Sequence, residues 1–180
     1  VNKNDAFDSG EPFTDLSGNG KRDHDPFGEL GNHPHLRELY LYENRITSLA
    51  SMGDLPRLET LLLGGNELTN LTDLSGLKTL KRLVLFDNHL SDIHGLFELK
   101  NLEYLYLTEN RLSDLRALRE LTSLRELHIQ HNHLTDMRPI ANLVELRVLG
   151  LSGNFFNDLG ALRGIKTLRR VGLADNNFNM

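Results

Sequence analysis

Leucine recurs along most of the chain with a period of 22 residues. From His35 onward the sequence divides without gaps into six blocks of this length, the first being HLRELYLYENRITSLASMGDLP, and a seventh block of 14 residues. The blocks share the pattern L-x-x-L-x-L-x-x-N-x-L-x-x-L-x-x-L-x-x-L. A fixed period of this length is typical of a solenoid, in which each block forms one coil and the stacked coils bury a common core.

Each block contains two hydrophobic spacings. In the first block Leu39 and Leu41 flank Tyr40, and this alternation predicts a short strand with its leucines on one side. Leu49, Met52 and Leu55 then follow at intervals of three, which predicts a return through a 3₁₀ turn or a short helix. Repetition of both elements predicts an α/β solenoid with a parallel sheet on the concave side and short helical segments on the convex side.

An asparagine occupies one fixed position in every block. The seven are Asn44, Asn66, Asn88, Asn110, Asn132, Asn154 and Asn176. An inward-turning amide offers two donors and an acceptor, enough to satisfy backbone groups of its own coil and of a neighbouring coil. We therefore interpret this column as structural and expect the loss of one asparagine to cost about 1–3 kcal/mol.

The repeat pattern resembles the leucine-rich repeat family. The 22-residue length and the L-x-x-L-x-x-L second half are similar to the class found in bacterial internalins and in a leucine-rich regulatory subunit of type-1 protein phosphatase. The resemblance covers residues 35–180 and implies a right-handed leucine-rich-repeat solenoid that recognises a protein ligand on its concave face and is not an enzyme. Residues 1–34 form a separate acidic segment that is expected to include an N-terminal cap.

Aromatic and apolar side chains gather among the outward positions of the first four strands, which hold all four tyrosines of the protein. Aromatic residues favour strands in general, but clustering on a sheet face that nothing else packs against favours partner binding. In the last two coils the same columns hold small residues, Gly150, Ser152, Gly172 and Ala174. The candidate partner-binding residues are Tyr40, Tyr42, Leu62, Arg82, Val84, Phe86, Tyr104, Tyr106 and His128.

The segment before the repeats contains DLSGNGKRD, which matches the calcium-loop pattern D-x-[DN]-x-[DN]-G. Its candidate ligands are Asp15, Ser17, Asn19, the backbone carbonyl of Lys21, and Asp23. The twelfth place, normally an acid, is Pro26, and Asp25 lies one residue early. A weaker preceding copy offers Asn2, Asn4, Asp8 and Glu11.

These two loops resemble the tandem, helix-free calcium loops of thrombospondin type-3 repeats and dockerins. The resemblance implies weak Ca²⁺ binding, on the order of 10⁻⁴–10⁻³ M, as in extracellular modules. An acidic, disordered linker is the alternative interpretation. Phe27 and Leu30, which follow the loops, are expected to cover the leucines of the first coil.

The composition narrows the possible functions. The formal net charge of −5 provides no basic field for nucleic acid, and no apolar run approaches the ~20 residues of a membrane span. No Ser-His-Asp arrangement or phosphate loop can be assembled from the repeats, so no catalytic residue is assigned. The histidines of HIQHNH, His128, His131 and His133, are interpreted as surface residues rather than as a metal site.

Weak calcium loops predict an extracellular or cell-surface location, because cytosolic calcium would leave them empty. The function predicted is adhesion or protein recognition. An intracellular regulatory scaffold of the phosphatase-subunit type and a targeting arm of a larger enzyme remain as alternatives. Because Phe178 and Met180 fall in mid-coil, either a following segment or a second copy is expected to cover the last leucines.

Overall fold

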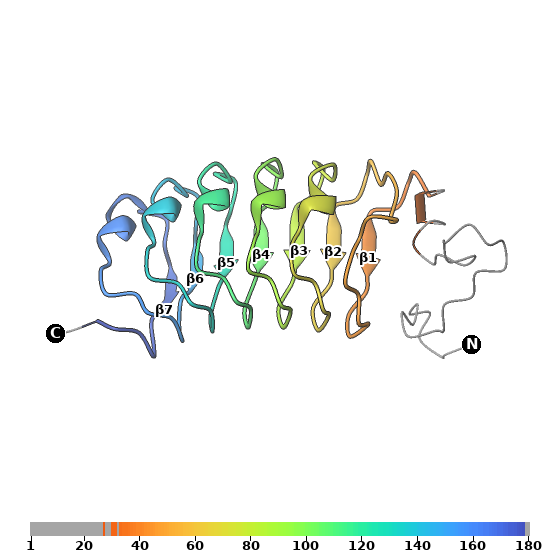
Figure 1. Ribbon diagram of the computed structural model, residues 1–180. Helices are drawn as coiled ribbons and strands as arrows, with labels where there is room; N and C mark the ends of the chain where they lie inside the picture. The colour runs from red at the N-terminus through yellow and green to blue at the C-terminus, as the bar shows by residue number, and fades with distance from the viewer. Residues whose placement is uncertain (1–26, 28–29, 32, 179–180) are drawn as a thin grey trace.

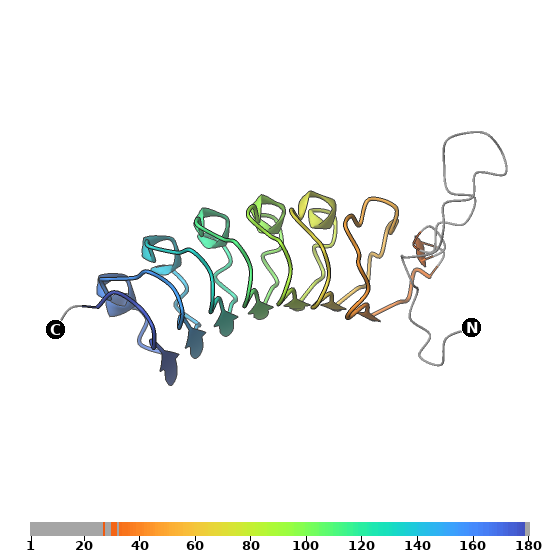
Figure 2. The ribbon, with the colours of Figure 1, turned by 60° about the horizontal axis from the view of Figure 1, so that its bottom comes forward.

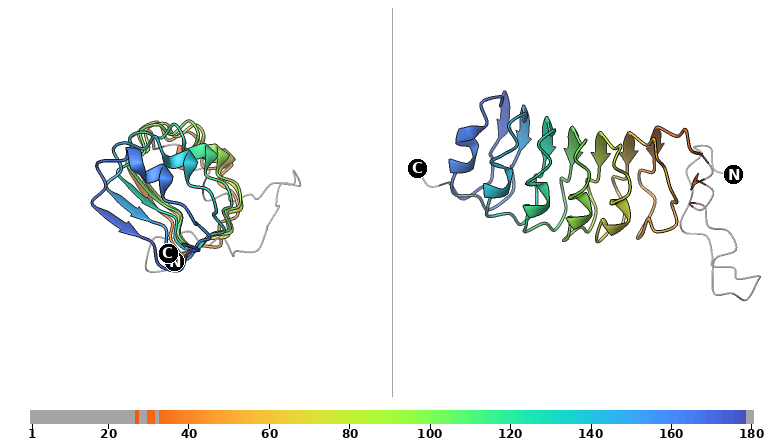
Figure 3. Two further views of the ribbon diagram at one scale, coloured as in Figure 1. Left: turned by 90° about the vertical axis from the view of Figure 1, so that its left-hand side faces the viewer. Right: turned by 90° about the horizontal axis from the view of Figure 1, so that it is seen from above.

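A computed structural model describes residue 27, residues 30–31 and residues 33–178. Within them the chain forms a gently curved stack of coils, with the strands along the inner side of the curve and the helical turns along the outer side (Figures 1 and 2). Viewed from the end and from above, the coils lie one behind another in sequence order (Figure 3). The architecture confirms the predicted solenoid with a parallel sheet and short 3₁₀ segments.

One strand of three residues comes from each coil. The strands are β1 (Glu38–Tyr40), β2 (Thr60–Leu62), β3 (Arg82–Val84), β4 (Tyr104–Tyr106), β5 (Glu126–His128), β6 (Val148–Gly150) and β7 (Arg170–Gly172). They pair in parallel and in sequence order. The register advances by one full repeat at every step, as in Tyr40 opposite Leu62 and Leu62 opposite Val84. Equivalent positions of the repeat therefore form straight columns across the sheet.

The outer side carries a 3₁₀ helix in five coils. These are η2 (Thr72–Leu74), η3 (His94–Leu96), η4 (Arg116–Leu118), η5 (Arg138–Ile140) and η6 (Gly160–Gly164). An Asn or Asp two residues before the helix starts its turn: the side chain of Asp114, for example, accepts a hydrogen bond from the backbone N–H of Arg116 at 2.9 Å. Leucines at intervals of three then point into the stack, which explains the tight return.

The core is a column of leucines shared by adjacent coils. Leu61, Leu83, Leu105 and Leu127, one from each central strand, have no exposed surface. Phe27 and Leu30 are buried against the first coil, as the sequence predicts, and belong to the same core. At the other end Leu159 and Val171 keep 40% and 37% of their surface exposed, because within the described chain they have a neighbouring coil on one side only.

The asparagine column joins each coil to the one before it. The Oδ1 atom of Asn110 accepts a hydrogen bond from the backbone N–H of Leu90 at 3.0 Å. Its Nδ2 group donates to the carbonyls of Leu85 and Leu107 at 2.9 and 3.2 Å. Because these bonds reach both coils, the structural interpretation of the column is confirmed.

We expect Asn110→Ala to lower the free energy of unfolding by about 1–3 kcal/mol, because it leaves buried backbone groups of two coils without a partner. Urea denaturation measures the change. The control is Asn142→Ala, at an exposed position on the outer side, which should change stability by less than about 0.5 kcal/mol. Equal stability of the two variants would contradict the structural role of the column.

Candidate functional site on the concave face

The outward columns of the strands form one continuous surface, called here the concave face. It comprises the first and last residues of each strand, which point outward, and the residue two positions after each strand ends. Examples of the latter are Tyr42, Phe86 and Gln130. Tyr40 is 57% exposed, and Tyr42 and Phe86 are each 39% exposed. These three side chains are the accessible aromatic surface of the first three coils.

A glycine allows the aromatic pair of this surface to form. The ring centroids of Tyr42 and Phe86 are 5.8 Å apart although one coil separates the two residues. The intervening coil has Gly64 at the equivalent position, and the Phe86 ring lies across it: a Cβ atom on Gly64 would be 2.5 Å from Cε1 of Phe86. A larger residue at position 64 would therefore separate the two rings.

The centre of the face is a stack of three planar groups. The rings of Tyr106 and His128 are parallel, with centroids 4.8 Å apart and an interplanar angle of 5°. The Arg82 guanidinium lies 5.1 Å from the Tyr106 centroid and 5.8 Å from that of Tyr104. A cation over an aromatic face is attracted by the ring quadrupole, so Arg82 and Tyr106 hold one another in place.

Glu126 contacts both rings of this stack. Its Oε2 atom accepts a hydrogen bond from the Tyr106 hydroxyl at 3.0 Å and lies 3.8 Å from Nε2 of His128. Burial raises the pKa of Tyr106, and the bond to Glu126 adds to that shift. Burial lowers the pKa of His128, Glu126 opposes this effect, and the Arg170 charge adds a smaller lowering. Burial thus outweighs Glu126 and leaves the pKa of His128 below its ordinary value.

The structure corrects the sequence-based assignment of Val84. Its side chain points to the concave face and is not part of the leucine core, but it is only 4% exposed. Its partners in the register are the larger residues Leu62 on β2 and Tyr106 on β4. Val84 is thus a support beneath the surface. Arg82 is exposed, whereas Leu62, Tyr104, Tyr106 and His128 are half-buried.

Sequence reasoning missed the polar residues that order this face. Thr108 donates a hydrogen bond from Oγ1 to Oε1 of Gln130 at 3.0 Å, and Nε2 of Gln130 lies 3.3 Å from Nδ1 of His128. Gln130 also lies over Gly150, where a Cβ atom would be 2.2 Å from Nε2. The repeat register could have revealed these contacts from the sequence. Thr108 and Gln130 share one outward column, and His128 and Gly150 share the neighbouring column.

The other candidate residues divide into two groups. His131 lies against Gly153, and His133 is tilted against Phe155 with ring centroids 6.4 Å apart, so the three histidines have separate neighbours. Among the described residues there is no cluster of three or more His, Asp or Glu side chains suited to a metal ion.

The candidate calcium ligands lie outside the described residues. They are Asn2, Asn4, Asp8, Glu11, Asp15, Ser17, Asn19, Lys21, Asp23 and Asp25.

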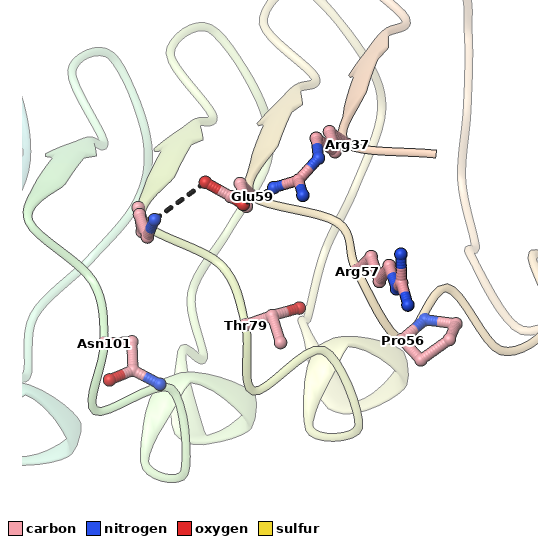
Figure 4. A pocket seen from close by; sticks show the side chains of 7 residues that line it. Arg37, Pro56, Arg57, Glu59, Thr79 and Asn101 are labelled. Carbon is pink, nitrogen blue, oxygen red and sulfur yellow. Dashed lines mark hydrogen bonds and ion pairs between the residues drawn. The ribbon is translucent and has the colours of Figure 1, made fainter. Parts of the chain in front are cut away.

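A second surface feature lies on the lateral edge, where the chain enters the strands. An open hollow of about 400 Å³ is lined by Arg37, Pro56, Arg57, Glu59, Thr79, Lys81 and Asn101 (Figure 4). Glu59 lies between two cations: Lys81 Nζ is 2.7 Å from its Oε2, and Arg37 pairs with its Oε1. These pairs hold the pKa of Glu59 below its ordinary value, with the Lys81 hydrogen bond as the main cause. Glu59 is thus engaged by two cations, and Arg57 adds further positive charge to the hollow.

We expect Gly64→Ala to separate Tyr42 from Phe86, because the new methyl group occupies the place of the Phe86 ring. The phenyl group can rotate into solvent, so the free energy of unfolding should change by less than about 1 kcal/mol. Nuclear Overhauser contacts between the two rings measure the separation. The matched control is Gly76→Ala, where a Cβ atom meets nothing within 4 Å; ring contacts that survive in Gly64→Ala would contradict the packing.

Comparison with known proteins supports the fold. A family model described as leucine rich repeat matches residues 78–134, and one described as leucine rich repeats (2 copies) matches residues 34–76 and 122–164. No curated protein sequence matches the chain. Among the described residues no helix has the length and apolar character needed to cross a membrane.

Three solved structures illustrate the similarity. Internalin C2 of Listeria monocytogenes is 30% identical with a TM-score of 0.69, covering 82% of this chain and 74% of its own. Internalin InlF of the same organism is 27% identical with a TM-score of 0.66, covering 88% of this chain and 53% of its own. A third structure is the ectodomain of the plant receptor kinase GASSHO1/SCHENGEN3 from Arabidopsis thaliana in complex with Casparian strip integrity factor 2. It shares the fold at 24% identity with a TM-score of 0.69, and the match covers 78% of this chain and 18% of the receptor chain.

These matches extend over most of the repeat array. The resemblance to bacterial internalins is carried by the two Listeria structures. The fold and its neighbours support a role as a protein-binding module. The chain belongs to the leucine-rich repeat family.

Proposed function

We propose that the protein is a non-catalytic recognition module that binds a protein partner through the aromatic part of its concave face. One observation carries the proposal: Tyr40, Tyr42 and Phe86 stay exposed on a sheet face that no segment of the described chain covers, and the Tyr42 and Phe86 rings lie 5.8 Å apart. Aromatic residues that are accessible and held in place lose little conformational entropy on binding, which makes them effective anchors for a partner.

The surrounding contacts support this proposal. Arg82, Tyr106, His128 and Glu126 form a connected set that fixes the centre of the face before a partner arrives. A surface that is already ordered avoids the cost of ordering side chains on association. The accessible rings lie next to this rigid centre, so a partner would meet an apolar patch beside a polar, hydrogen-bonding one.

The setting proposed for this activity is the cell surface or the extracellular space, as an adhesion or recognition module. The similarity to two internalins and the calcium-loop pattern of residues 1–26 support it. The chain spans 53% of the InlF structure, so the activity of a whole protein of that kind is a further proposal. An intracellular scaffold of the phosphatase-subunit type and a targeting arm of an enzyme are the competing functions.

The double variant Tyr40→Ala/Phe86→Ala should lose partner binding, because it removes the two ends of the exposed aromatic patch. Peptides of 12 random residues displayed on phage are selected on the parent protein, and the affinity of selected peptides is measured by fluorescence anisotropy. We expect Kd to rise at least about tenfold in the double variant.

The control for this experiment is Phe97→Ala on the outer side, where the ring is 46% exposed and lies 5.5 Å from Nζ of Lys100. It should change Kd less than about twofold. Peptides that bind the parent and the double variant equally would contradict recognition through the aromatic patch. Circular dichroism checks that all variants keep the fold.

Calcium binding is proposed for the segment before the repeats and is tested by isothermal calorimetry on the whole chain. Titration with CaCl₂ should give a Kd on the order of 10⁻⁴–10⁻³ M, and Asp15→Ala/Asp23→Ala should abolish the heat because two carboxylate ligands are removed. Asp175→Asn, in an exposed turn, serves as the control. No calcium heat in the parent would contradict the proposal and favour the intracellular scaffold.

A further inference from the structure

The lateral edge carries a column of charged residues, and the pattern of positive and negative charge in this column changes along the stack. The column consists of the residue directly before each strand: Arg37, Glu59, Lys81, Glu103, Arg125, Arg147 and Arg169. Neighbours in this column are one coil apart, so opposite charges can pair between coils. The signs alternate through the fifth coil and then stop alternating.

Opposite charges pair between coils among the first five members of the column. Glu59 pairs with Arg37 on one side and with Lys81 on the other, and the dashed line in Figure 4 marks the Lys81 pair. Nη1 of Arg125 lies 2.8 Å from Oε2 of Glu103. Every acid of the column is thus already engaged by a cation of the first five coils.

The last two coils have cations in excess. Arg147 and Arg169 continue the column, and Arg170 follows in β7, opposite Val148 of β6. All three side chains are exposed, and none has an ion pair with any described residue. Because adjacent strands lie about 4.8 Å apart, these three residues occupy neighbouring backbone positions, and they are called here the arginine triad.

The triad sits where the lateral edge meets the concave face. Arg170 belongs to an outward column of the sheet, and its charge reaches His128 two coils away. The neighbouring floor in the last two coils is made of Ser152, Gly172 and Ala174, whereas Gln130 covers Gly150, so an extended segment can approach the arginines over small side chains on the β7 side. This end of the face therefore differs from the aromatic end in both shape and charge.

The negative charge on the rest of the surface favours the approach of an acidic segment from the side of the triad. The protein carries a net charge of −5. The opposite edge of the sheet, at the residue before each column asparagine, holds Glu43, Asp87, Glu109 and Asp175 and no Lys or Arg. An acidic segment would be repelled by that edge and attracted to the triad, which fixes its position and its side of approach.

We infer that the arginine triad binds carboxylate side chains of an acidic segment of the protein partner, which lies over coils five to seven while apolar side chains of the same partner contact the aromatic end. This inference rests on the proposed function and adds the chemistry and the orientation of the partner. Guanidinium groups recognise carboxylates through paired, charge-assisted hydrogen bonds, so three arginines at neighbouring backbone positions select for closely spaced Asp and Glu.

The peptide selection described above tests this inference through the composition of its products. Peptides selected on the parent should be enriched in Asp and Glu. The triple variant Arg147→Gln/Arg169→Gln/Arg170→Gln should lose that enrichment and raise Kd for a selected acidic peptide by about tenfold or more at 0.15 M salt. The parent affinity should also weaken as NaCl is raised to 0.5 M, because the charges are exposed and screened.

A matched control removes the same charge elsewhere. Arg45, Arg111 and Arg119 are exposed and without an ion pair among the residues described, so Arg45→Gln/Arg111→Gln/Arg119→Gln changes the net charge equally. It should change Kd less than about twofold. Equal loss of affinity in both triple variants would overturn the inference, because the effect would then come from net charge alone.

The remaining outcomes separate the two proposals. Selected peptides that depend on Tyr40 and Phe86 but show no acidic enrichment would overturn the triad inference and leave the aromatic patch intact. Acidic peptides that depend on the triad but not on the aromatic residues would support the triad and contradict the proposed function. A labelled twelve-nucleotide oligothymidine that binds the triad more tightly than the acidic peptide would also overturn the inference, since phosphate would then be the preferred ligand.

Discussion

The structure depends on a single constraint: no coil can bury its own leucines or satisfy its own inward asparagine. Leu83 and Leu105 lose their exposed surface only because coils lie on both sides, and the Asn110 amide uses hydrogen-bonding groups of two coils. Both requirements are met by the same exact repetition, which aligns every position into a column. The inner parallel sheet and the columns of outward side chains are consequences of that stacking.

Much of the fold could be predicted from the sequence because the repeat has few solutions. The spacing around Leu39 and Leu41 gave the strand, the interval of three from Leu49 gave the 3₁₀ return, and the shared Asn gave the join between coils. The burial of Phe27 and Leu30 followed from the need to cover the first coil. In each case a local pattern and a packing requirement pointed to the same result.

The details of the concave face could not be predicted in the same way. Column positions show which residues face outward, but not how far a long side chain leans over its neighbour. Val84 shows this limit, because its exposure depends on the larger side chains beside it. Phe86 shows the opposite case: the glycine at position 64 lets its ring reach Tyr42, so the patch extends across three coils. Residues 1–26, which hold the candidate calcium ligands, lie outside the described structure.

Native-state hydrogen exchange tests the central constraint most directly. The backbone amides of Leu68, Leu90 and Leu112 donate to asparagine side chains of the following coil rather than to a strand partner. If stacking through these asparagines holds the coils together, the three amides exchange as slowly as the amide of Leu85, which donates to Tyr106 in the adjacent strand, and only through unfolding of several coils. Exchange of these amides at the rate of exposed turn residues would contradict the account.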